Sequence, residues 1–214
     1  MNSSEVTTQI ETKLGSFTEL PFLFIGSGFS RRYLGLPDWE GLLKEMANLA
    51  RNGDELAYSN YKNQVKHESQ ENLLPRTASL IQRDFDNNWF EKKHWIQSKR
   101  FDLIKDGVSP FKVAISQFCE MHTRPVTEKG LQDELAVFKR LANRSIAGVI
   151  TTNYDLLIED YLKDYKIYVG QDELIFKPIH GIHEIYKIHG CLTRPDSLII
   201  NEHDYLEFSR KNAY

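Results

Sequence analysis

The feature that most constrains the fold is a set of three short apolar runs, far apart in the chain, that end abruptly in glycine or polar residues. They occupy residues 21–25, 145–152 and 185–188. Short runs of aliphatic, aromatic and β-branched residues are typical of buried strands. The first run leads into a glycine-rich turn and the second into a helical stretch at 156–163, as in βα units. We therefore predict an α/β fold built on a Rossmann-like parallel sheet.

A long stretch of helical pattern separates the first two runs. Residues 40–51 repeat apolar side chains at helical spacing, and Asp38 is placed to cap the N-terminus of that helix. Residues from about 52 to 145 are mostly helical and polar, so we predict a helical insertion or small helical subdomain there. Its aromatic residues should lie in a core rather than on a partner surface. Helix breaks are expected at Pro75, Pro110 and Pro125.

Two shorter segments also carry local signals. Residues 1–20 predict a helical lead-in, with Ile10 and Leu14 four positions apart, and the apolar run at 197–200 predicts a further short strand. The chain has 214 residues, of which 41% are hydrophobic and 27% charged. This length and composition suit one packed domain with an insertion, so we predict that residues 1–214 form a single α/β unit.

Charge and cysteine content argue against several classes of protein. The formal net charge of -3 does not favour the basic surface that binds nucleic acids. Cys119 and Cys191 are far apart and form no Cys-x-x-Cys pair, so neither a disulfide framework nor a zinc site is expected. The N-terminus lacks an apolar signal segment, and no stretch reaches the roughly 20 apolar residues that cross a bilayer. We expect a cytoplasmic protein that binds neither membranes nor nucleic acids directly.

Each of the three runs ends in groups that could bind a ligand. Residues 26–30 (Gly-Ser-Gly-Phe-Ser) would let a phosphate approach the backbone closely, and would also suit an ordinary tight turn. Residues 151–155 (Thr-Thr-Asn-Tyr-Asp) offer hydroxyl, amide and carboxylate groups, and would also cap a helix. His189 could be a general base or a structural histidine. In open parallel sheets, ligands bind beyond the carboxyl ends of the strands, where all three clusters are expected.

In combination and in this order, the clusters resemble the sirtuin (Sir2-like) family, specifically its divergent branch found in bacterial defence proteins. The turn at 26–30 is similar to the family's Gly-Ala-Gly-x-Ser turn, with serine in place of alanine. Residues 151–155 look like its Thr-Gln-Asn-x-Asp segment except at Thr152, and His189 precedes a glycine as the family's catalytic histidine does. Two further stretches, 35–39 and 195–205, also look like the divergent branch.

The resemblance implies a sirtuin-like domain that takes NAD as its substrate and binds no metal. Deacylating sirtuins carry a zinc ribbon of four cysteines soon after the catalytic histidine, whereas this chain has only Cys191 in that region. It therefore resembles the zinc-free enzymes that cleave NAD. We expect an NAD glycohydrolase that releases nicotinamide and ADP-ribose, and the divergent branch implies a role in anti-phage defence by NAD depletion.

The resemblance also implies roles for individual residues. Asn153 would orient a water molecule or ribose hydroxyl, and His189 would act on it as the general base. Asp155 would fix the ribose or organise the loop that carries Asn153. His180 and His183 lie nearby, but neither ends a strand as His189 does. The pyrophosphate would be held near a helix N-terminus by Gly26, Ser27, Gly28 and Ser30.

Several alternatives stay open at this level. A cyclase or an ADP-ribosyl transferase would break the same bond and differ in the nucleophile that follows. A sensor module would bind NAD or an ADP-ribose-type nucleotide without turnover. The helical insertion could form a homo-oligomer interface, and a sensor or activator domain or protein could control the site. Sirtuin-like domains continue into a further strand, whereas this sequence stops at Tyr214 within an apparent helix, so we expect the N-terminal part of a longer protein.

Overall fold

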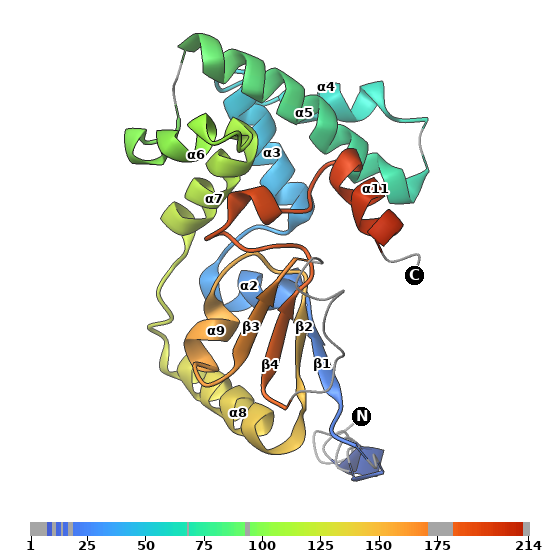
Figure 1. Ribbon diagram of the computed structural model, residues 1–214, viewed down its shortest axis with the longest axis vertical. Coiled ribbons are helices and arrows are strands. Elements are labelled where there is room, and N and C mark those ends of the chain that lie inside the picture. Colours follow the sequence, from blue (N-terminus) through green and yellow to red (C-terminus); the bar gives the residue numbers. More distant parts are fainter. Residues whose placement is uncertain are drawn as a thin grey trace.

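The computed structural model describes residues 8–9, 12–13, 15–16, 19–67, 69–92, 95–170 and 182–211. A parallel sheet with its covering helices forms one end of the molecule, and a group of helices forms the other (Figure 1). Most of the predicted lead-in at 1–20, including Ile10 and Leu14, lies outside the described residues. Within the described ranges, no helix combines the length and apolar character needed to cross a membrane.

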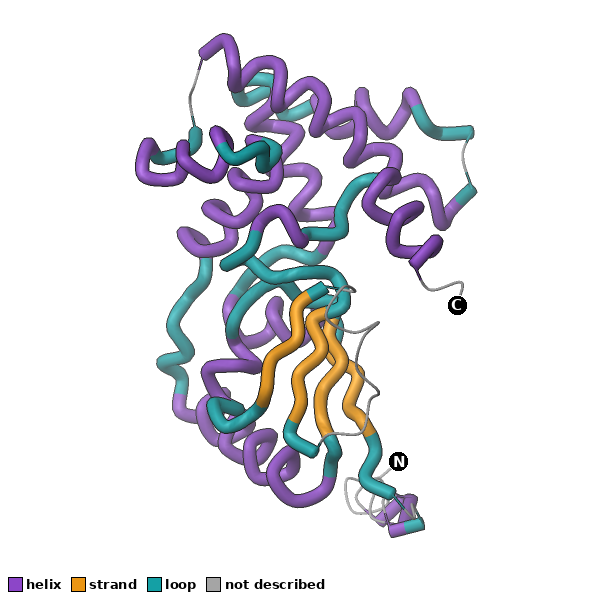
Figure 2. The backbone as a smooth tube through the Cα atoms, viewed as in Figure 1, coloured by secondary structure: helices purple, strands orange, loops and turns teal. Residues whose placement is uncertain are grey.

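The sheet has four strands in the order β1-β2-β4-β3, and every neighbouring pair is parallel (Figure 2). This confirms the predicted α/β fold with a Rossmann-like parallel sheet. The sequence analysis did not identify β3, which lies at one edge of the sheet and has only three apolar residues, after Lys166. The strands are β1 (Phe22–Ile25), β2 (Gly148–Thr151), β3 (Lys166–Val169) and β4 (Glu184–Lys187).

Helices α2 (Ser27–Leu34), α8 (Lys129–Ser145) and α9 (Leu157–Tyr161) contribute to the core on one face of the sheet. Apolar side chains that point to the same face of neighbouring strands form the centre of this core, as the two-residue period of strands requires. They meet buried side chains from α8 and α9. The core includes Ile25, Val149 and Ile185 from the sheet and Ala142 and Ile158 from the helices.

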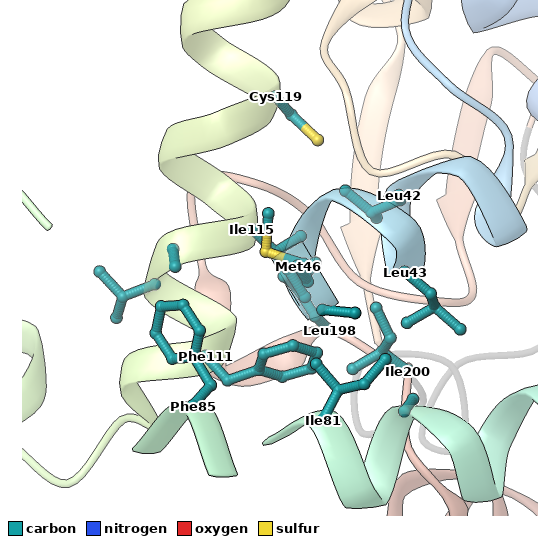
Figure 3. Packing of buried hydrophobic residues seen from close by; sticks show 14 of the residues in the cluster. Leu42, Leu43, Met46, Ile81, Phe85, Phe111, Ile115, Cys119, Leu198 and Ile200 are labelled. Atoms are coloured by element: carbon teal, nitrogen blue, oxygen red, sulfur yellow. The ribbon is translucent and has the colours of Figure 1, made fainter. Parts of the chain in front are cut away.

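The helical half of the molecule has its own core, shown in Figure 3. Asp38 caps α3 as predicted, because its Oδ1 accepts a hydrogen bond of 2.9 Å from the Gly41 N–H. Helices α3, α5 and α7 contribute the labelled residues Leu42, Leu43, Met46, Ile81, Phe85, Phe111, Ile115 and Cys119. The elements are α3 (Trp39–Ala50), α4 (Ala57–Gln64), α5 (Gln70–Lys92), η1 (Ser98–Arg100), α6 (Phe101–Lys105), α7 (Pro110–His122), η2 (Pro195–Ser197) and α11 (Glu202–Lys211).

Two of the three predicted proline breaks are confirmed. Pro110 begins α7, and Pro125 lies in the segment between α7 and α8. The prediction for Pro75 is wrong, because this residue lies inside α5. Pro75 falls in the second turn, so its missing N–H removes a single helical hydrogen bond, to the Glu71 carbonyl, close to the start of the helix.

The predicted strand at 197–200 is also wrong. Ser197 ends the short helix η2, and the following residues are extended without pairing to a described strand. Leu198 and Ile200 are fully buried in the core of the helical half, among α3, α5 and α7 (Figure 3). The apolar pattern of this segment therefore reflects packing against helices, which a short sequence pattern cannot distinguish from a strand.

Replacement of Leu198 by alanine should destabilise the protein by about 2–5 kcal/mol, because it leaves a cavity in the helical core. Leu206, which is 52% exposed on α11, offers a matched control, and Leu206→Ala should change the free energy of unfolding by no more than about 0.5 kcal/mol. Chemical denaturation of the two variants checks this. Equal stabilities would contradict the placement of Leu198 in that core.

Candidate active site

The three polar clusters of the sequence meet at one edge of the sheet. Strands β1, β2 and β4 are consecutive neighbours and run in the same direction, so their carboxyl ends lie together. A cavity of about 270 Å³ opens there between the sheet and the helical half. It is lined by Ser27, Ser30, Leu36, Pro37, Asp38, Trp39, Leu42, Cys119, Thr152, Asn153, Tyr154, Asp155, His189 and Tyr205.

The turn after β1 presents the N-terminus of α2 to solvent. Gly26 is the N-cap and makes no side-chain capping bond, and the first turn of the helix contains no acidic residue. A Cβ atom added to Gly26 or Gly28 would meet no other atom within 4 Å, so there is open space beside this backbone. The free N–H groups of a helix N-terminus attract anions. Gly26, Ser27 and Gly28 therefore lie where a phosphate group could accept their backbone hydrogen bonds.

Asn153 is buried at the end of β2 and held by its neighbours on β1. Its side-chain Nδ2 donates to the Gly26 carbonyl at 3.0 Å, and its backbone N–H donates to the Thr151 hydroxyl at 3.0 Å. The Thr151 hydroxyl in turn donates to the Ile25 carbonyl at 2.9 Å. Because the amide nitrogen is engaged, the amide oxygen of Asn153 is the atom left to accept a hydrogen bond from a ligand or water.

Asp155 and Ser30 form a buried hydrogen bond that joins α2 to the segment after β2. The Ser30 hydroxyl donates to Asp155 Oδ2, and Asp155 Oδ1 accepts from the Leu157 N–H at 3.0 Å. Both carboxylate oxygens are thus used within the protein. This favours the expected role of Asp155 in organising the Asn153 loop. It also commits the hydroxyl proton of Ser30, which leaves the backbone at 26–28 as the better phosphate donor.

His189 follows β4 and is partly enclosed by aromatic rings. The imidazole makes edge contacts with Tyr205 and Phe208, each with ring centroids 5.6 Å apart. Burial lowers the pKa of His189 to about 4, so the ring is neutral at pH 7 and able to accept a proton. The His189 carbonyl accepts a hydrogen bond of 3.0 Å from the Ile199 N–H, which fixes the backbone after the strand.

Gly190 allows the chain to turn sharply after His189. Its φ is +92°, and a Cβ atom there would come within 2.2 Å of the Ser197 carbonyl oxygen. The conformation and the close approach both require glycine. The same turn is held from the β2 side, because Leu192 N–H donates to the Tyr154 carbonyl at 3.0 Å and the Tyr154 hydroxyl donates to the Ile199 carbonyl at 2.7 Å.

A buried ion pair that the sequence analysis missed lies directly beneath the site. Lys187, the last residue of β4, has a side chain that is 0% exposed, and its Nζ lies 2.6 Å from Glu159 Oε1. The same ammonium donates to the Asp155 carbonyl. Burial raises the pKa of Glu159, and the charge of Lys187 opposes that effect. Lys187 therefore links the strand that carries His189 to the segment that carries Asp155.

Three other lining residues were not predicted as part of a site. Trp39 begins α3, Tyr205 lies on α11, and Cys119 lies on α7, so the helical half supplies one wall of the cavity. Burial raises the pKa of the Cys119 thiol to about 12, and the thiol therefore stays protonated at neutral pH. The family resemblance at residues 35–39 and 195–205 had pointed to the segments that carry Trp39 and Tyr205. It gave no sign that these two segments meet in the structure.

His183 lies away from the cavity. It precedes β4 at the opposite end of the strand from His189, and its ring contacts Tyr165 with centroids 4.8 Å apart. His180 lies outside the described residues. The part of the chain that the structure describes contains no group of three or more His, Cys, Asp or Glu side chains that could hold a metal ion.

The lowered pKa of His189 should make folding stability depend on pH. The pKa is about 4 in the folded state and about 6.5 in the unfolded chain, so the unfolded state binds more protons between these values. The contribution of His189 to the free energy of unfolding should be constant above about pH 6.5 and should fall by roughly 3 kcal/mol by pH 4. The slope should be smaller in His189→Gln. Parallel stability curves for the two proteins, measured by denaturation from pH 7.5 to 4, would refute this.

Substitution of Gly190 by alanine should destabilise the protein more than the same change at Gly53. Both residues have a similar positive φ, +92° and +94°, so both variants bear the backbone strain of roughly 1–2 kcal/mol. Only at Gly190 would the new methyl group also meet the Ser197 backbone, because a Cβ at Gly53 has no neighbour within 4 Å. Thermal and chemical denaturation measure the difference. Equal effects would mean that the turn after His189 is not tightly packed.

A comparison with models of protein families gives a match to part of the chain. A family model described as a SIR2-like domain matches residues 147–214, which include Asn153, Asp155, His189 and Tyr205. The turn at 26–30 lies outside the matched segment. No curated protein matches the chain. The match supports a SIR2-like domain in the part of the chain that carries β2, β4 and α11.

Proposed function

We propose that the chain is an NAD glycohydrolase that cleaves NAD to nicotinamide and ADP-ribose. The observation that carries this proposal is the arrangement of Asn153 and His189 in one cavity, next to the open N-terminus of α2. The match of residues 147–214 to a SIR2-like domain supports it independently, because enzymes of that family use NAD.

The chemistry of the cavity fits the nicotinamide riboside end of NAD. Its volume of about 270 Å³ is slightly below the range of roughly 300–1,000 Å³ that is typical of ligand pockets, so it would hold only part of a dinucleotide. Among the described residues that line it, two are carboxylates, Asp38 and Asp155, and none is Lys or Arg. Such a lining suits the cationic nicotinamide ring better than a phosphate. The pyrophosphate would instead lie at the backbone of Gly26, Ser27 and Gly28, outside the narrow part of the cavity.

The residues could promote cleavage of the nicotinamide–ribose bond in the following way. Neutral His189 would accept a proton from water or a ribose hydroxyl, and the amide oxygen of Asn153 would orient that group. Positive charge builds up on the ribose as the bond breaks, and Asp155, whose carboxylate accepts from Ser30 and Leu157, would hold the loop that places Asn153 beside it. The apolar wall from the helical half would limit the entry of bulk water.

The cellular role is part of the same proposal and is supported by the resemblance of the motifs to defence proteins. Hydrolysis would deplete cytoplasmic NAD during phage infection. Such an activity would be restrained until it is needed, which is consistent with a homo-oligomer and with a sensor or activator domain or protein. The domain would comprise residues 1–214, with residues from about 52 to 145, which include helices α4 to α8, as its insertion.

Incubation with NAD and chromatography of the products should reveal nicotinamide and ADP-ribose. Asn153→Ala and His189→Ala should each lower the rate by about 100-fold or more, as expected for loss of positioned acid–base groups. His183→Ala is the matched control, because His183 lies at the far end of β4, and it should hydrolyse NAD at the wild-type rate. Release of nicotinamide with a cyclic or transferred product would indicate a cyclase or transferase. NAD binding without turnover would indicate the sensor function instead.

A further inference from the structure

Helix α11 is fixed to the helical half of the molecule at its N-terminal end. The Glu202 N–H donates to the Ser79 hydroxyl of α5 at 3.1 Å. The side chain of Asp204 forms an ion pair of 2.7 Å with Lys112 of α7, and both side chains are only 12% exposed. Asp204 Oδ2 also accepts the backbone N–H groups of Ile200 and Asn201, at 3.0 and 3.2 Å. The start of α11 is therefore held by α5 and α7 rather than by the sheet.

The next residue along, Tyr205, reaches from α11 across the cavity. Its ring stacks on Trp39, with centroids 5.5 Å apart and planes 25° apart. The same ring makes an edge contact with His189, at 5.6 Å and 82°. Phe208, one turn later on α11, meets the same imidazole at 5.6 Å and 89°. The aromatic groups that enclose His189 thus come from one helix, which belongs to the other half of the molecule.

We propose that Tyr205 is a positioning residue that holds the His189 imidazole in the cavity, and that α11 lets the helical half of the molecule control this base. The catalytic part of the proposal rests on the proposed function of His189. The control would act through packing. A shift of α11 against the sheet would withdraw Tyr205 from both Trp39 and His189, widen the cavity and expose the imidazole to water.

The surroundings of the imidazole support this assignment. The ionisable groups that share the cavity with it are Tyr205 from α11, Cys119 from α7, Asp38 before α3, and Tyr154 and Asp155 after β2. Burial raises the pKa values of Tyr205 and Cys119 to about 12 and also raises that of Tyr154, so these three groups stay protonated. The lowered pKa of His189 is caused by burial, to which the rings of α11 contribute. Loss of that cover should allow the imidazole to become charged more easily.

The first test follows the His189 ring by NMR during a pH titration and needs no ligand. In Tyr205→Ala the pKa should rise from about 4 toward the ordinary value near 6.5. Tyr205→Phe keeps the ring, and Leu206→Ala changes an exposed neighbour on the same helix, so both should retain a pKa near 4. An unchanged pKa in a folded Tyr205→Ala protein would overturn the proposal. Phe208→Ala, which removes the second ring, serves the same purpose if Tyr205→Ala fails to fold.

The second test separates control by the helical half from local packing. Lys112→Met removes the ion pair that anchors α11 and leaves the side chains of Trp39, Tyr205 and Phe208 unchanged. If the anchor positions Tyr205, the His189 pKa should rise in this variant too. A shift in Tyr205→Ala that is absent from Lys112→Met would reject the control by the helical half.

The third test uses NAD hydrolysis by the same set of variants. Tyr205→Ala should lower kcat about 10- to 100-fold through misplacement of the base, with a smaller change in KM, while Tyr205→Phe should retain activity. Full activity of Tyr205→Ala would contradict the positioning role. A wild-type protein that does not hydrolyse NAD would refute the proposed function alone, since the titration would still decide whether Tyr205 holds His189.

Discussion

Parallel pairing of β1, β2 and β4 is the constraint on which the site depends. Each pair is in register over four residues, so Ile25 aligns with Thr151 and Thr151 with Lys187. The groups that follow these residues therefore lie at one level, although they are more than 120 residues apart for the first two strands. The hydrogen bond from Asn153 to the Gly26 carbonyl is a direct result, because it spans the gap between the ends of β1 and β2.

At this edge of the sheet, an ion pair stabilises the buried charge of Lys187, and burial keeps His189 neutral. Lys187 carries a cation into a region that is fully enclosed, where it would be strongly unfavourable without Glu159 and the Asp155 carbonyl. His189 loses its charge instead, because its surroundings are mostly aromatic. The result is a site in which the fixed charge lies beneath the cavity and the ring beside it stays neutral.

The sequence allowed the prediction of those parts of the fold that depend on local pattern. Strands β1, β2 and β4 were predicted from short apolar runs, and the rules of parallel sheets predicted that the residues which end these runs lie at one edge of the sheet. Edge strand β3 was not identified because only three apolar residues, Ile167–Val169, follow Lys166 and give too short a signal. The run at 197–200 was misread because burial against helices gives the same short apolar signal.

The parts of the site that could not be predicted arise from contacts between remote segments. The sequence around Trp39 and around Tyr205 contains no pattern that predicts the stacking of the two rings. The sequence around Lys187 does not distinguish it from any other lysine at the end of a strand. The ion pair between Lys112 and Asp204, which holds the start of α11 to α7, joins two residues 92 positions apart, and no periodicity reveals it.

The wide sequence separation of the residues that line the cavity affects the order in which parts of the protein fold. Ser30 and Asp155 are separated by 125 residues, and Tyr205 closes the cavity from near the other end of the described chain. Contacts of such long range form late, because the loops between them must first be ordered. During synthesis, the first helices can pack before β2, the neighbour of β1, has been made. The cavity is complete only after α11 has emerged from the ribosome. A nascent chain that ends before Tyr205 would therefore lack one wall of the cavity.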